Sequence, residues 1–134
     1  EELLVKRHNN ELANKLGNLV SRISSLAENY GIEKTENKLL KKLNLKKIEK
    51  YLENFEFDKA LGVIFSFIDV CNEYIQKTKV WESKDKKVLF EVVESIRKIN
   101  PHLEIFIPQT AKKIEKTFKT DKIKKSKILF KKIK

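Results

Sequence analysis

Residues 56–78 read EFDKALGVIFSFIDVCNEYIQKT, and this stretch predicts a long helix that is buried on most of its faces. Its small or polar positions repeat at spacings of four, three, four and three, as one exposed stripe of a helix does. These positions are Gly62, Ser66, Asp69, Glu73 and Gln76. The other positions are mostly apolar, so we expect this helix to lie at the centre of a helical bundle.

The chain before this stretch is also expected to be helical, first over residues 2–29. Its apolar side chains recur every three or four residues, which is the helical period, and Gly31 supplies a stop. This stripe consists of Leu12, Leu16, Leu19, Ile23 and Leu26. A shorter helical region is expected over residues 36–54, with Thr35 as its N-cap and a division near Asn44.

The chain after this stretch carries signals for two more helices. Ser83 is expected to cap a helix that ends or kinks at Pro101. Residues 102–107 are expected to continue this helix after the kink, because no partner strand for them is visible elsewhere in the sequence. Pro108 fits the first turn of a last helix over residues 109–118.

The composition favours an all-α bundle of about five helices in a single domain. The chain has 134 residues, 40% of them hydrophobic and 37% charged, with three Gly and two Pro to break helices. We expect the bundle over residues 1–118 and a basic tail over residues 119–134 that packs back on it or extends from it. The single cysteine, Cys71, rules out an intramolecular disulfide and argues against a Cys-based metal site. With no 18-residue apolar run and no signal-peptide pattern, we expect no membrane contact and a cytoplasmic location.

Positive charge is concentrated at the C-terminal end. The formal net charge is +11, and residues 112–134 contribute eleven Lys against one Glu and one Asp, a net of +9. Such a segment suits phosphates, or an acidic surface of a protein or membrane, although a simply solvated lysine-rich terminus has the same pattern. The candidate phosphate-binding residues are Lys122, Lys124, Lys125 and Lys127.

Binding chemistry is expected at two further places. Asn14, Asn18 and Arg22 follow each other at intervals of four, so a helix aligns them on one face, about 120° from the apolar stripe. Two amides and a guanidinium form a strip suited to reading the polar edges of nucleobases, although a solvated polar stripe is the alternative. Trp81 lies at a junction between two helices, where it can stack on an unpaired base or plug the end of the bundle.

No catalytic constellation is visible in the sequence. His8 and His102 are far apart and have no evident acid or nucleophile partner, and Cys71 is expected to be structural. The chain also lacks a Gly-rich phosphate loop and any expected metal site. We therefore expect a binding protein that does not catalyse a reaction by itself.

Several segments resemble, in order, the anticodon-binding domain of methionyl-tRNA synthetases. Residues 11–22, ELANKLGNLVSR, resemble the opening helix of that domain. Further similar segments are residues 57–61, 72–75 and 79–82, which match a later helix and its Trp junction, residues 107–114, and residues 128–133. Where the family has proline this chain has Val80 and Lys131, and Pro101 interrupts a helix that the family keeps continuous.

The resemblance implies a function in tRNA recognition. Asn14, Asn18 and Arg22 would bind the flipped-out bases of the CAU anticodon of methionine tRNA, above all the first base, a cytosine, and Trp81 would stack there. ATP and methionine would bind a catalytic domain, in cis or as a separate subunit, and no cofactor is expected in this chain. Two alternatives remain at this point: a helical module that docks on an acidic protein partner, and the related domain of a leucyl, isoleucyl, valyl or cysteinyl enzyme.

Overall fold

The computed structural model describes residues 12–125 as helices joined by short loops, with no strand among these residues. The expected all-α fold is therefore confirmed. Five of the helices have nine or more residues. In chain order the elements are the π-helix η1 (Leu12–Gly17), α3 (Asn18–Tyr30), the 3₁₀-helix η2 (Leu39–Lys42), α4 (Leu45–Glu53), α5 (Phe57–Thr78), α6 (Val80–Ser83), α7 (Lys86–Leu103) and α8 (Pro108–Phe118).

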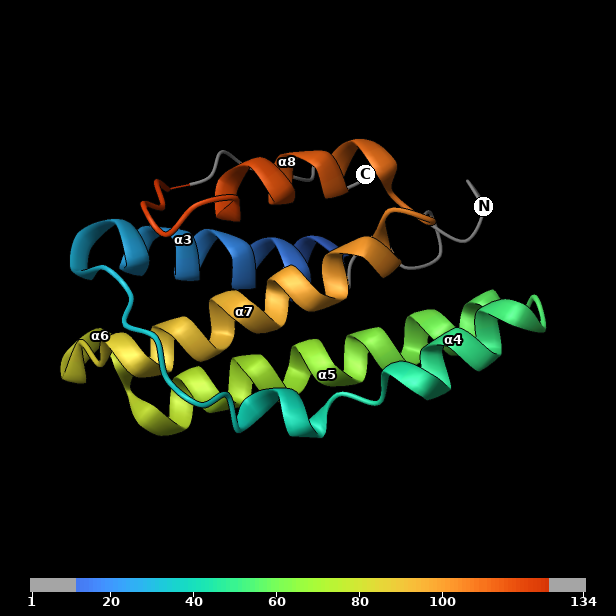
Figure 1. Ribbon diagram of the computed structural model, residues 1–134, viewed down its shortest axis with the longest axis horizontal. Helices are drawn as coiled ribbons and strands as arrows, with labels where there is room; N and C mark the ends of the chain where they lie inside the picture. The colour runs from blue at the N-terminus through green and yellow to red at the C-terminus, as the bar shows by residue number, and fades with distance from the viewer. Residues whose placement is uncertain (1–11, 126–134) are drawn as a thin grey trace.

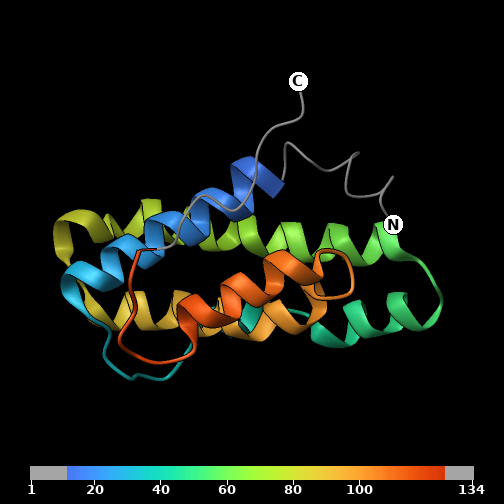
Figure 2. The same cartoon turned by 90° about the horizontal axis from the view of Figure 1, so that it is seen from above.

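The long helices run side by side along the longest axis of the molecule (Figure 1). Helix α7 packs against α8 and α3 on one side and against α5 on the other, and α4 covers α5 from outside. Seen from above, η1 and α3 pass beside α5 (Figure 2). Helix α5, expected at the centre, contributes eight buried residues to a single core that also includes side chains from α3, α7 and α8.

The first helix differs in part from the expected continuous α-helix over residues 2–29. Residues 12–17 form a π-helix, and the α-helix begins at Asn18. The expected stop is confirmed, because Gly31 has a positive φ of 79° and its N–H donates to the carbonyl of Ala27 over 2.8 Å. Residues 1–11 lie outside the described part of the chain.

Both N-caps expected from the sequence are wrong, and in each case an Asn or Asp residue further along the chain takes the role. Asn44, not Thr35, caps α4 by accepting from the N–H of Lys47. Asp85, not Ser83, caps α7 through the N–H groups of residues 87 and 88. Ser83 instead ends the short α6, where the sequence predicted a junction between two helices.

Proline has a weaker effect on α7 than expected. The helix passes through Pro101 and ends at Leu103, followed by a turn over residues 104–106. The expected continuation over residues 102–107 is therefore wrong beyond its first two residues. Pro108 is the first residue of α8, as expected, where its missing N–H costs no helical hydrogen bond.

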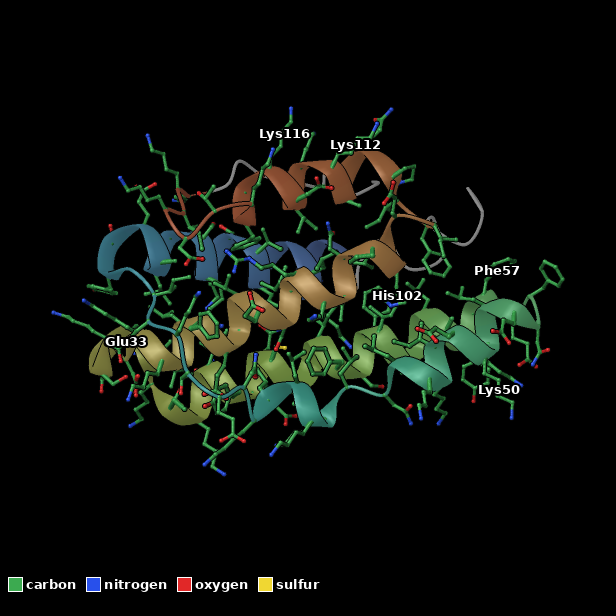
Figure 3. The ribbon with its side chains drawn as sticks, viewed as in Figure 1. Glu33, Lys50, Phe57, His102, Lys112 and Lys116 are labelled. Atoms are coloured by element: carbon green, nitrogen blue, oxygen red, sulfur yellow. The ribbon has the colours of Figure 1, made fainter. Side chains whose placement is uncertain are left out.

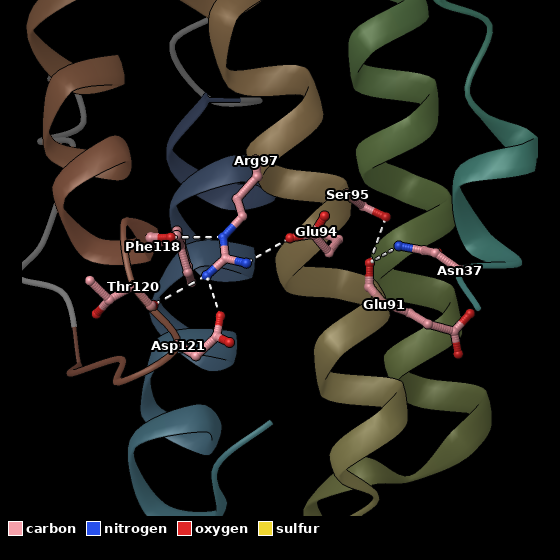
Figure 4. A network of polar contacts seen from close by, with 8 residues as sticks. All are labelled: Asn37, Glu91, Glu94, Ser95, Arg97, Phe118, Thr120 and Asp121. Carbon is pink, nitrogen blue, oxygen red and sulfur yellow. Dashed lines mark hydrogen bonds and ion pairs between the residues drawn. The ribbon is translucent and has the colours of Figure 1, made fainter. Parts of the chain in front are cut away.

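A buried carboxylate fastens the loop between α3 and α4 to the bundle. One oxygen of Glu91, on α7, accepts from the hydroxyl of Tyr74 over 2.7 Å, and the other accepts from the N–H groups of Lys38 and Leu39. The carbonyl of Glu91 accepts from Asn37 and from Ser95 (Figure 4). Since residue 91 is 7% exposed, these donors replace the water that its carboxylate loses on burial.

An arginine on the same helix fastens the segment after α8. Arg97 donates to the carbonyls of Phe118 and Thr120 and pairs with Glu94 and Asp121 (Figure 4). Ile123 is buried in the core beyond this point. Residues 119–123 thus lie against the bundle, whereas the domain boundary at residue 118 stays a prediction. The apolar end over residues 128–130 lies outside the described residues.

Candidate nucleic-acid interface

A shallow groove of about 560 Å³ opens between the N-terminal helix and α5. Asn14, Asn18 and Arg22 form one wall. The opposite wall consists of four side chains from the last two turns of α5, namely Asn72, Glu73, Gln76 and Lys77. The groove thus places four carboxamides beside a guanidinium, an ammonium and a carboxylate.

The two walls are tied together at the level of η1. Lys15 forms an ion pair with Asp69 on α5 over 3.1 Å, and Asn72 donates to the carbonyl of Lys15 over 3.5 Å. Leu16 and Leu19 are fully buried, whereas Asn14 and Asn18 are exposed and Arg22 is half-buried, so these three polar side chains are turned away from the core. The wider turn of a π-helix such as η1 shifts the side chains around the helix from one turn to the next. Such turns often lie at functional sites.

Trp81 closes one end of the interface. The guanidinium carbon of Arg22 lies 5.8 Å from the centre of the Trp81 ring, within the range of a cation–π interaction. Val80 is fully buried and anchors α6, whereas Trp81 is 38% exposed. The indole is therefore partly free to stack on a ligand while Arg22 helps to fix its position.

The structure brings together four of the residues selected from the sequence and leaves three of the basic candidates apart from them. Asn14, Asn18 and Arg22 line one groove, and Arg22 contacts Trp81. The basic candidates Lys122, Lys124 and Lys125 do not line that groove, and Lys127 lies outside the described residues. The N–H of residue 125 donates to the carboxylate of Glu28 over 2.6 Å, which places this segment beside the C-terminal end of α3.

The α5 wall of the groove was missed at the sequence level. The sequence placed Glu73 and Gln76 on an exposed stripe. No sequence pattern indicated that this stripe faces Asn14, Asn18 and Arg22 on the first helix. The signal that could have found the wall is that both helices carry polar side chains next to their buried faces. Asn72 lies just beside the stripe, where its contact with Lys15 could not be read from spacing.

The groove can bind a polar ligand and offers no catalytic set. Carboxamides donate and accept, the cations donate and Glu73 accepts, so a planar ligand with mixed polar edges fits this chemistry. Cys71 is fully buried, and burial raises the pKa of its thiol to about 12, which keeps it a neutral structural side chain. Among residues 12–125, no three His, Cys, Asp or Glu side chains group to hold a metal ion, and no helix is long and apolar enough to cross a membrane.

Comparison with known proteins gives a consistent set of relatives. The family described as anticodon-binding domain of tRNA ligase matches residues 36–133. Proteins named methionine–tRNA ligase from Caldanaerobacter subterraneus (35% identical, 84% of this chain), Clostridium acetobutylicum (32%, 85%) and Mycoplasmopsis pulmonis (32%, 96%) are similar over most of the sequence. The chain spans 21%, 21% and 28% of the length of these three relatives, respectively.

Proposed function

The chain belongs to the family of anticodon-binding domains of tRNA ligases, and from this premise we propose that it reads the CAU anticodon of methionine tRNA as part of a methionine–tRNA ligase. The similar proteins carry that name. The match to the Mycoplasmopsis protein covers 96% of the chain and therefore includes residues 14–22.

The groove between the first helix and α5 is the observation that carries this proposal. Anticodon bases can be splayed out of the loop, so that side chains bind their Watson–Crick edges. The carboxamides of Asn14, Asn18 and Gln76 can each donate to and accept from a base edge. Glu73 can accept from the exocyclic amino group that both cytosine and adenine carry, and Trp81 supplies a stacking face.

A binding assay with RNA hairpins tests the proposal. We expect a hairpin with CAU in its loop to bind more tightly than hairpins of equal length whose loop bases are replaced or scrambled. Asn18→Ala should weaken CAU binding and leave the thermal unfolding temperature unchanged, because the side chain is exposed. Ser66→Ala, an exposed change on α5 outside the groove, is the matched control. Equal affinity for CAU and scrambled loops would refute anticodon reading.

The remaining chemistry of the ligase is proposed to reside in another domain, joined to this chain or supplied as a separate subunit. ATP and methionine would bind there, since the groove offers no nucleophile and no phosphate-binding loop. Methionine-dependent exchange of pyrophosphate into ATP tests this division of labour. We expect no exchange with this chain alone, and exchange by the isolated chain would contradict the proposal.

A further inference from the structure

Helix α6, which carries Trp81, is bracketed by two lysines with left-handed backbones. Lys79 has φ 47° and Lys84 has φ 54°. Lys79 is both the C-cap of α5 and the N-cap of α6, and the N–H of Lys84 closes α6 on the carbonyl of Val80 over 2.8 Å. Glycine and asparagine adopt this conformation with less strain than lysine, so both positions hold a side chain that the backbone does not favour.

Backbone strain alone does not indicate a site. Phe55 adopts the same conformation, with φ 58°, before the other end of α5. What distinguishes the α6 corner is its charge. Lys77, which lines the groove, precedes Lys79 by two positions and Lys84 by seven, and none of the three forms an ion pair within residues 12–125.

The neighbouring acids compensate the positive charge of this cluster of lysines only in part. Lys87 is paired with Glu33 over 3.7 Å, at the end of the bundle where α6 lies (Figure 3). The carboxylate of Asp85 caps α7 and keeps its negative charge. Asp85, Glu73 and Glu82 are thus the nearby acids, against which stand the three lysines and Arg22.

Helix α6 is also clasped against α3 by two reciprocal contacts. Arg22 of α3 lies over the ring of Trp81, and the ammonium of Lys84 lies 5.4 Å from the ring centre of Tyr30, the last residue of α3. Lys84 is thereby held beside α3, Lys79 directly precedes α6, and Lys77 lines the adjacent groove. Cations that surround a base-stacking side chain are the arrangement that binds the backbone of single-stranded nucleic acid.

We propose that Lys77, Lys79 and Lys84 form a rim that binds the backbone phosphates of an RNA loop whose bases enter the groove beside Trp81. This inference rests on the proposed RNA-binding function and deepens it. It assigns the phosphate contacts to the α6 corner rather than to the tail lysines. The contacts of the rim are with phosphates, so they strengthen the binding of every loop sequence alike.

The test exploits the left-handed backbone. In the double variant Lys79→Gly and Lys84→Gly, two charges are lost while the strain at both positions is relieved. We expect the thermal unfolding temperature to stay equal or rise. Hairpin affinity should fall by the same factor for CAU and scrambled loops, and the slope of log K against log salt should become less steep by about 1.4, since each phosphate contact contributes about 0.7.

A matched control removes the same charge elsewhere. Lys112→Gln with Lys116→Gln neutralises two exposed lysines on the outer face of α8 (Figure 3), and we expect affinity and slope to change much less. An unchanged slope in the glycine variant, or an equal change in the control, would overturn the rim. If CAU and scrambled loops bind equally in the wild type, anticodon reading fails, and the salt slopes of the glycine and control variants still decide whether the rim exists.

Discussion

Arg22 and Trp81, on helices separated by almost sixty positions in the chain, meet with the guanidinium carbon 5.8 Å from the ring centre. This contact joins two features that are separate in the sequence, the polar strip on the first helix and the single tryptophan. Arg22 thus lines the groove and also contacts the indole of Trp81.

Trp81→Ala should weaken binding of a CAU hairpin while the helical fold survives. Loss of a stacked base costs about 1–3 kcal/mol, which is about 5- to 160-fold in affinity, and a partly exposed side chain contributes little to the core. Trp81→Phe should keep part of the affinity. Because Trp81 is the only tryptophan, RNA should also change the intrinsic fluorescence of the wild type. Unchanged affinity in the alanine variant would remove Trp81 from the interface.

Arg22→Lys should weaken CAU binding although the charge is conserved. Lysine lacks the planar fork that binds a base edge through two hydrogen bonds, and it packs less well on an indole face. We expect a loss of about 1–3 kcal/mol for CAU loops and a nearly unchanged salt slope. Isothermal titration at two salt concentrations measures both quantities. Unchanged affinity and unchanged selectivity for CAU loops would mean that Arg22 does not bind a base edge.

Periodicity was sufficient to predict the fold because each long helix has a clear apolar face. It placed α5 and α8 to within one residue. The N-caps were wrong because several residues near each helix start could cap it, and the choice depends on the loop path that tertiary contacts impose. Glu91 on α7 shows this dependence, because its carboxylate accepts hydrogen bonds from the N–H groups of Lys38 and Leu39, which precede α4.

One wall of the groove could be predicted from the sequence, and the other could not. Asn14, Asn18 and Arg22 share a helix, so their spacing and the resemblance sufficed to select them. The opposite wall depends on how α5 rotates against the first helix, and that rotation is fixed by contacts such as Asn72 with the Lys15 carbonyl. Single-helix periodicity contains no information on such contacts between elements.

Neutralising the described tail lysines, Lys122, Lys124 and Lys125, tests their predicted role. If they contact RNA phosphates, replacing all three with alanine should make the salt slope less steep by about 2, at 0.7 for each phosphate. If the α6 corner supplies the phosphate contacts, the slope should stay close to that of the wild type. The fold should persist in either case, because the three side chains are exposed. Filter binding of one hairpin over a series of salt concentrations measures the slope.

Cys71 should be unreactive in the folded protein. The thiol is fully buried, and its pKa of about 12 leaves almost no thiolate at pH 8. We expect a thiol reagent to modify Cys71 at the rate of global or large local opening, and to modify one thiol per chain at once in denaturant. Fast labelling of Cys71 in the folded protein under native conditions would contradict the buried placement.

Tyr74→Phe should destabilise the protein at neutral pH and less so at high pH. The phenol donates to the buried carboxylate of Glu91, and its loss should cost about 1–3 kcal/mol. Burial and the hydrogen bond to Glu91 both raise the pKa of Tyr74 in the folded state above its usual value of 10.0. The contribution of the phenol is thus fully present below pH 10 and is lost as pH rises towards the folded-state pKa.

Urea unfolding of wild type and Tyr74→Phe at pH 7 and pH 11 measures the gap between their free energies of unfolding, and we expect this gap to narrow at pH 11. Lysine deprotonation is common to both proteins and cancels in the difference. A gap that stays constant with pH would mean that Tyr74 does not titrate differently in the folded state.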